Sequence, residues 1–167
     1  GKVALLTVKE EQLLAGKIEE AKYLRKIERD ELNSGSGLPR ESAAMLNILR
    51  HVIAGLSTID SIIRRQGLIQ GDSFNRTIRN AGLTGIVGGV MEEAFMESLA
   101  EDNNSTSSDV WRDCIDLSIY GRLMPLALFG IIGEETSWYD VALLVNDPVD
   151  AGFLLKLQAI SNEFKTF

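Results

Sequence analysis

Cysteine, histidine and long apolar runs are scarce in this 167-residue chain, which has one cysteine, one histidine and three prolines. A single cysteine excludes a disulfide within the chain and fits a reducing compartment. The longest apolar stretch, residues 123–132, is interrupted by Pro125 and Gly130. It falls short of the roughly 20 residues that cross a bilayer. The opening GKVALLTVKEE lacks the features of a signal peptide. We therefore expect a soluble, cytoplasmic protein with no membrane partner.

Basic residues are missing from positions 92–111, which hold six acidic residues. The formal net charge of the chain is −7. Residues 1–32 carry seven groups of each sign, so the whole acidic excess lies on residues 33–167. Because phosphate binding needs clustered Lys and Arg, this acidic part should repel duplex DNA.

The residue types of a catalytic centre are also few. His51 has no partner in the sequence pattern that would make it a general base or a metal ligand, so we expect a structural or surface histidine. Cys114 has no basic neighbour that would activate a thiolate, and we expect it to be a small buried residue. We therefore predict no enzyme activity, no cofactor, no metal and no small-molecule substrate. A helical enzyme remains the least favoured alternative.

Glutamates, glycines and tryptophans that could suggest a metal, phosphate or ligand site have simpler structural interpretations. The glutamates are expected to lie on solvated helix faces, since the Glu-x-x-His partner of helical di-metal sites is missing: Glu92, Glu93, Glu97, Glu134 and Glu135. The glycines at 82, 85, 88 and 89 match no phosphate-binding loop and indicate close helix packing or a turn. Trp111 and Trp138 are expected in the core.

Helical patterns dominate the sequence. We expect helices over about 7–32, 39–66, 72–80, 86–101, 107–120, 121–132 and 137–146, and a last one opened by Asp147. The predicted fold is an all-α bundle of about six to eight helices with an N-terminal helical arm. The arm is residues 1–32, a flexible linker rich in Gly and Ser follows at 33–39, and the acidic helical domain is 40–167.

The beginning of the arm is the best-marked helix start in the chain. Thr7 and Glu10 have the spacing of a capping box, in which the Thr hydroxyl and the Glu carboxylate each accept a free backbone N–H. An apolar stripe at helical spacing follows: Leu13, Leu14, Ile18, Ala21, Leu24 and Ile27.

The opening residues GKVALLTVKEEQLLAGKIE resemble region 1.2 of the bacterial primary (housekeeping) RNA polymerase sigma factors. That block typically reads G-x-V-x-L-L-T-x-E-E-E-x-x-L-A-x-x-I-E. Ala4 stands where the family often has proline, and Lys9 where it has glutamate. The matching positions are Gly1, Val3, Leu5, Leu6, Thr7, Glu10, Glu11, Leu14, Ala15, Ile18 and Glu19.

The resemblance implies a role in transcription initiation. In this family a variable, often acidic, helical insertion follows region 1.2, and residues 33–167 would correspond to it. The chain would then be a fragment that lacks region 2 and the C-terminal domains. Its partners would be core RNA polymerase and, within the full-length protein, promoter DNA. The resemblance places Gly1, Lys2, Lys9 and Lys17 near DNA. The alternative is a stand-alone helical domain for protein interaction or regulation.

Overall fold

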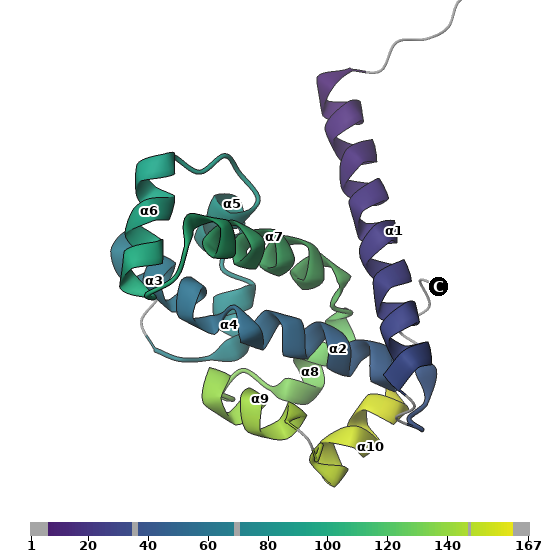
Figure 1. Ribbon diagram of the computed structural model, residues 1–167. Coiled ribbons are helices and arrows are strands. Elements are labelled where there is room, and N and C mark those ends of the chain that lie inside the picture. Colours follow the sequence, from purple (N-terminus) through teal and green to yellow (C-terminus); the bar gives the residue numbers. More distant parts are fainter. Residues whose placement is uncertain (1–6, 35–36, 69–70, 147, 162–167) are drawn as a thin grey trace, which may run out of the picture.

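The computed structural model describes residues 7–34, 37–68, 71–146 and 148–161 (Figure 1). Within these ranges there are ten α-helices and no β-strand, which confirms the all-α prediction and exceeds the expected number of helices. They are α1 Val8–Ser34, α2 Arg40–Ala54, α3 Leu56–Gln66, α4 Phe74–Ile78, α5 Ala81–Val87, α6 Glu93–Asp102, α7 Ser107–Leu123, α8 Leu126–Ile132, α9 Trp138–Val145 and α10 Ala151–Ala159.

Helix α2 lies at the centre of the bundle. It packs against α1, α7, α9 and α10, as Figure 1 shows. Its sequence explains this position, because apolar residues cover more than one face of the helix and are fully buried: Ala44, Met45, Leu46, Ile48, Leu49 and Val52. A helix that is apolar over most of its surface must be surrounded by other elements.

Helix α1 is the longest of the described elements, and its first turns project beyond the rest of the bundle in Figure 1. Its second half packs on α2 and α7, where Ile27 is completely buried. The predicted arm is therefore a helix that is anchored at one end. It continues to Ser34, slightly past the expected end at residue 32.

The helix predicted over residues 39–66 is two helices. Helix α2 ends at Ala54, α3 begins at Leu56, and the two axes differ by 52°. The break falls at Gly55, whose N–H donates to the carbonyl of Val52 (3.2 Å). The bend brings Thr58 to Asp113 of α7, with a 2.7 Å hydrogen bond.

Several predicted helices differ from those of the structure. In some cases one predicted helix is two helices, and in others the cap or the first residue lies a few positions away. The helix expected over 86–101 begins only at Glu93, and a separate helix, α5, precedes it. The cap of α7 is Thr106 rather than Ser107 or Ser108. The last helix is capped by Asp150, which accepts from the N–H of Phe153; Asp147 lies outside the described residues.

The glycine cluster forms the end of α5 and the turn after it. A Cβ on Gly89 would lie 2.8 Å from the carbonyl oxygen of Gly85, and one on Gly82 would lie 2.8 Å from a methyl group of Leu68. At Gly89 the close neighbour is backbone, so this position needs glycine, as the sequence suggested; at Gly82 it is the end of a leucine side chain, which can move.

No single helix within the described ranges is long and apolar enough to cross a membrane. The bent pairs α2–α3 and α7–α8 reach the required length and composition only when their two helices are taken together.

Candidate functional site

The start of α1 has the Thr7 half of the predicted capping box. The Oγ1 of Thr7 accepts a hydrogen bond from the N–H of Glu10 at 3.1 Å, and the carbonyl oxygen of Thr7 accepts from the N–H of Glu11 at 2.9 Å. The first of these bonds satisfies one of the N–H groups that a helix start leaves free. Thr7 and Glu10 are both exposed, so this cap is a local feature of the projecting end.

The residues expected near DNA are only partly described. Lys17 is exposed on α1. Lys9 lies in the first turn of α1, but its side chain is outside the described part of the structure, as are Gly1 and Lys2 altogether. How these four residues are arranged lies outside the described part of the structure, and their role at DNA stays a prediction.

The apolar stripe of α1 divides into two parts. Leu24 and Ile27 pack against the bundle core. Leu13, Leu14 and Ile18 are exposed, with 49% of Leu14 and 47% of Ile18 accessible to solvent. Neighbouring exposed apolar side chains on one helix are typical of a surface that binds another molecule. The exposed stripe of Leu13, Leu14 and Ile18 on α1 is thus the first candidate binding surface.

An aromatic and polar cluster joins α1 to the bundle. The hydroxyl of Tyr23 donates to a carboxylate oxygen of Asp116 on α7 at 3.0 Å. The ring of Tyr23 meets that of Tyr120 edge to face, with 4.9 Å between centroids. On the other side of Tyr120, the imidazole of His51 is stacked in parallel at 4.5 Å. Three helices are therefore held together by one row of rings.

The titration of this cluster is set mainly by burial. Burial, together with the nearby Asp116 carboxylate, raises the pKa of Tyr23 to about 12 and raises the pKa of Tyr120 further. Burial lowers the pKa of His51, although Asp116 acts in the opposite direction. His51 is thus favoured in its neutral form and has a packing role, as expected from the sequence.

Two ion pairs cross the same junction at its surface. Arg122 of α7 contacts Glu20 of α1 at 3.2 Å, and Arg40 of α2 contacts Glu28 of α1. Such exposed pairs contribute little energy each, so the buried Ile27 and the ring cluster hold α1 in place.

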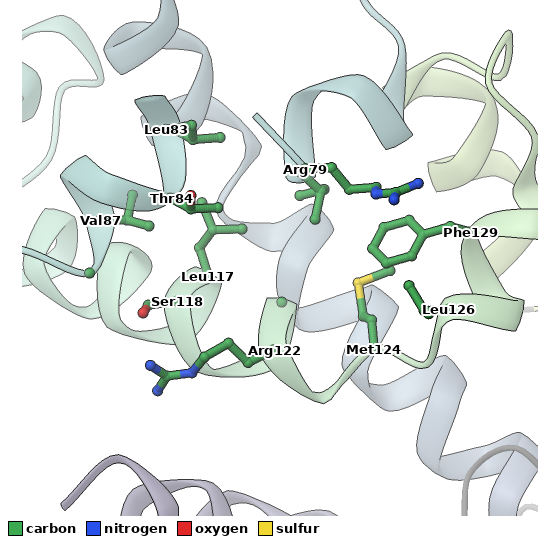
Figure 2. Close-up of a pocket in the computed structure, with 13 residues that line it drawn as sticks. Arg79, Leu83, Thr84, Val87, Leu117, Ser118, Arg122, Met124, Leu126 and Phe129 are labelled. Carbon is green, nitrogen blue, oxygen red and sulfur yellow. The ribbon is translucent and has the colours of Figure 1, made fainter. Parts of the chain in front are cut away.

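A cavity of about 350 Å³ lies among α4, α5, α7 and α8 (Figure 2). Its walls are mainly apolar: Ile78, Leu83, Val87, Leu117, Met124, Leu126 and Phe129. Figure 2 shows Arg79 beside the ring of Phe129, and its guanidinium carbon is 5.3 Å from the ring centroid. Among the described residues that line it, Arg79 and Arg122 are the only ionisable groups. This lining offers shape and apolar contact but no acid–base pair.

The single cysteine and the glutamates lie in surroundings that suit a structural role. Cys114 is buried, and burial raises the pKa of its thiol to about 12. Glu135 faces Arg76 at 3.2 Å, and Glu134 faces Arg79 at 4.0 Å. In the ranges that the structure describes, no group of three His, Cys, Asp or Glu side chains is arranged to hold a metal ion.

The expectation for the two tryptophans is correct for one of them. Trp138 is 4% exposed and packs against the ring of Phe74, with centroids 4.8 Å apart. Trp111 is 48% exposed, so its placement in the core was wrong. It lies on the outer face of α7, beside α1, and belongs to a surface that the sequence pattern did not indicate.

Comparison of the chain with models of protein families, with curated protein sequences and with solved structures gave no match in any of the three.

Proposed function

We propose that this chain is part of a bacterial primary sigma factor, containing region 1.2 and the insertion that follows it. In this proposal it acts by binding and not by catalysis. It contacts core RNA polymerase and helps to position that enzyme at promoter DNA. The helical bundle holds α1 so that the first turns of this helix and its exposed Leu14 and Ile18 are free to meet its partners.

The observation that supports the proposal most is the exposure of apolar side chains on α1. Within the stretch that resembles region 1.2, the described residues 7–19 are the start of a capped helix whose Leu14 and Ile18 are exposed. Both positions belong to the resemblance, and neither is among the residues of the buried core or those packed against it. An exposed apolar stripe on a projecting helix is suited to a partner that covers it.

The distribution of charge along the chain also supports the proposal. The arm is neutral, and residues 33–167 carry the whole excess of acidic groups. An acidic bundle suits contact with basic protein surfaces and disfavours unspecific binding to duplex DNA.

The test is binding to purified bacterial core RNA polymerase, measured by biolayer interferometry with the chain immobilised. We expect saturable binding, weakened about tenfold or more by Leu14→Ala with Ile18→Ala, because these residues are the proposed contact. The control pairs Leu143→Ala with Leu155→Ala, two leucines of α9 and α10 that are 71% and 67% exposed. Absent binding, or equal loss in the control, contradicts the proposal.

The second candidate is a stand-alone helical domain for protein interaction, which the bundle's own buried core favours. The gene distinguishes the two. A sigma factor requires the reading frame to continue beyond the codon for Phe167 into an aromatic-rich region 2 and a C-terminal helix-turn-helix. A frame that stops there favours the stand-alone domain.

A further inference from the structure

The cavity among α4, α5, α7 and α8 has the size and lining of a site for a small ligand. Its volume of about 350 Å³ lies at the lower end of the roughly 300–1,000 Å³ that is typical of ligand pockets. The apolar side chains of its wall are buried, except for Leu126, which is 77% exposed. Leu126 and Phe129 are three positions apart on α8 and are therefore neighbours on one face of this helix. Together they mark the side on which the cavity meets solvent.

Gly121 keeps part of this cavity open. It lies inside α7 and lines the cavity, and a Cβ added to it would meet nothing within 4 Å. Packing among the described residues therefore does not require a glycine here, although a glycine inside a helix is less stable than alanine. An unfilled apolar space is also unfavourable, because the side chains around it lose packing contacts. An apolar ligand that fills the cavity restores those contacts.

Arg79 supplies a positive charge at the open side of the cavity. Its guanidinium lies beside the ring of Phe129, with Leu126 at another edge of the same ring in Figure 2. The acidic partner of Arg79 is Glu134, at 4.0 Å, and both side chains are more than half exposed. An exposed pair at this separation is weak, so the guanidinium can turn to another anion.

The charges that line the cavity are all positive. Arg122 is the second basic residue of the lining; it is paired with Glu20 at 3.2 Å, and Figure 2 shows its guanidinium directed away from Met124 and Phe129. In the described part of the chain, no acidic residue belongs to the lining. The cavity is therefore locally positive in a chain whose formal net charge is −7. These charges favour a ligand with an anionic group, and Arg79 is the residue placed to bind it.

We propose that this cavity binds a small amphipathic carboxylate, such as a fatty acid of about eight to ten carbons. The alkyl tail lies among Leu83, Leu117 and Phe129, and the carboxylate stays at the open side, where it accepts hydrogen bonds from Arg79. Burial of the tail supplies most of the affinity, since it scales with the apolar area removed from water. The pairing with the guanidinium fixes the orientation and selects the sign of the charge. The proposal does not depend on the sigma-factor assignment.

The test is isothermal titration calorimetry of the full chain with hexanoate, octanoate and decanoate, each below its micelle concentration. We expect one site, with an association constant that rises about threefold to fourfold for each added CH₂ until the cavity is full. Octanoate should bind about tenfold or more tightly than octylammonium, because only the anion can accept from Arg79. The net charge of −7 acting alone would favour the cation. Tighter binding of octylammonium, or no dependence on chain length, overturns the proposal.

A substitution that fills the cavity tests the place of the tail. Gly121→Leu should weaken octanoate binding about tenfold or more, because the added side chain takes up space that the ligand needs. Gly130→Leu is the matched control, since Gly130 is also a helical glycine with nothing within 4 Å of a Cβ but lies outside the lining. Undiminished binding in Gly121→Leu, with the helical circular dichroism of the unaltered chain, contradicts the proposed site.

A second substitution tests the place of the carboxylate. Arg79→Leu should weaken octanoate binding about tenfold and leave the binding of octan-1-ol nearly unchanged, so that the two ligands bind alike. Arg76→Leu is the control, because Arg76 is a neighbouring exposed arginine that pairs with Glu135 and does not line the cavity. Equal loss of octanoate binding in the two variants would mean that the carboxylate is attracted by general charge, and it overturns the proposal.

Discussion

Tyr23 and Tyr120 lie ring to ring but differ in what their hydroxyl groups contact. The Tyr23 hydroxyl donates to Asp116, whereas the buried hydroxyl of Tyr120 has no hydrogen-bond partner among the described residues. A hydrogen bond to a charged acceptor contributes about 1.5–3 kcal/mol, and less where solvent reaches it. We therefore predict that Tyr23→Phe lowers the free energy of unfolding by about 1–2 kcal/mol, measured in urea.

Tyr120→Phe is the matched substitution. It removes a buried polar group that gains nothing in the described contacts, so we expect a free energy of unfolding within about 0.5 kcal/mol of the unaltered chain, or higher. A larger loss in Tyr120→Phe than in Tyr23→Phe would show that the two hydroxyls have been assigned the wrong roles.

Asp113 gives the fold a predictable dependence on pH. Burial raises the pKa of this carboxyl group above the ordinary value, although the hydroxyl of Thr58 donates to it and partly opposes the shift. The folded chain therefore holds this proton more tightly than the unfolded chain. The resulting contribution to stability is present below the ordinary Asp pKa and is lost as the pH rises through the raised value.

Asp113→Asn removes that titration. We predict that the variant gains stability relative to the unaltered chain as the pH is raised from about 3.5 to 7, in parallel urea titrations. A difference in unfolding free energy that is constant over this range, or that changes with the opposite sign, would contradict the assigned direction of the pKa shift.

At the scale of elements, the same kind of cap should have different consequences in α1 and α7. Thr7 caps a projecting end, and Thr106 caps a helix packed on α1, α2, α5 and α6. We predict that Thr106→Ala costs about 1 kcal/mol of global stability in urea. Thr7→Ala should leave the urea midpoint nearly unchanged, because the first turn of α1 can fray alone.

Amide hydrogen exchange measures the local effect directly. The N–H of Glu10 donates a hydrogen bond to Thr7 Oγ1, so its hydrogen should exchange at least about fivefold faster in Thr7→Ala. Amides near Ile27 should keep their protection. Unchanged exchange at Glu10 would argue against the cap.

Helix patterns and caps in the sequence predicted the fold class and most of the elements, since the buried stripe of α2 and the cap at Ser137 require only local information. The bend at Gly55, and the place of the predicted break between α7 and α8, which falls at Pro125 and not after residue 120, required more. Glycine and proline permit a break in a helix, but tertiary packing decides at which glycine or proline the helix actually ends. The caps Thr106 and Asp150 were missed because neighbouring Ser and Asp residues offered equivalent local patterns.

The candidate surfaces were predictable only in part. The cap and the exposed Lys17 follow from the first turns of α1. The ring cluster does not, because Tyr23 and Asp116 are 93 positions apart in the chain. The exposure of Trp111 was missed for a related reason: the sequence pattern is that of a core residue, and only the path of α1 past α7 shows otherwise.

At the scale of the whole molecule, charge separates the projecting helix from the bundle. The arm carries equal numbers of basic and acidic groups, and the net charge of −7 belongs to the remainder. Duplex DNA attracts proteins mainly through phosphate contacts with clustered cations. The basic side chains of the bundle are largely engaged by acids, as with Arg65 and Asp102 or Arg112 and Asp109.

We therefore predict that this chain alone binds a fluorescein-labelled duplex poorly, even at about 50 mM salt. The matched variant carries Glu97→Lys and Glu101→Lys on the exposed face of α6. Each exchange adds two charges, so its formal net charge is −3 instead of −7. If charge repulsion is the cause, this variant should show more anisotropy change than the unaltered chain, and added salt should abolish the difference. Tight, salt-dependent binding by the unaltered chain would instead require a phosphate-binding surface on the arm, strong enough to overcome the field of the bundle.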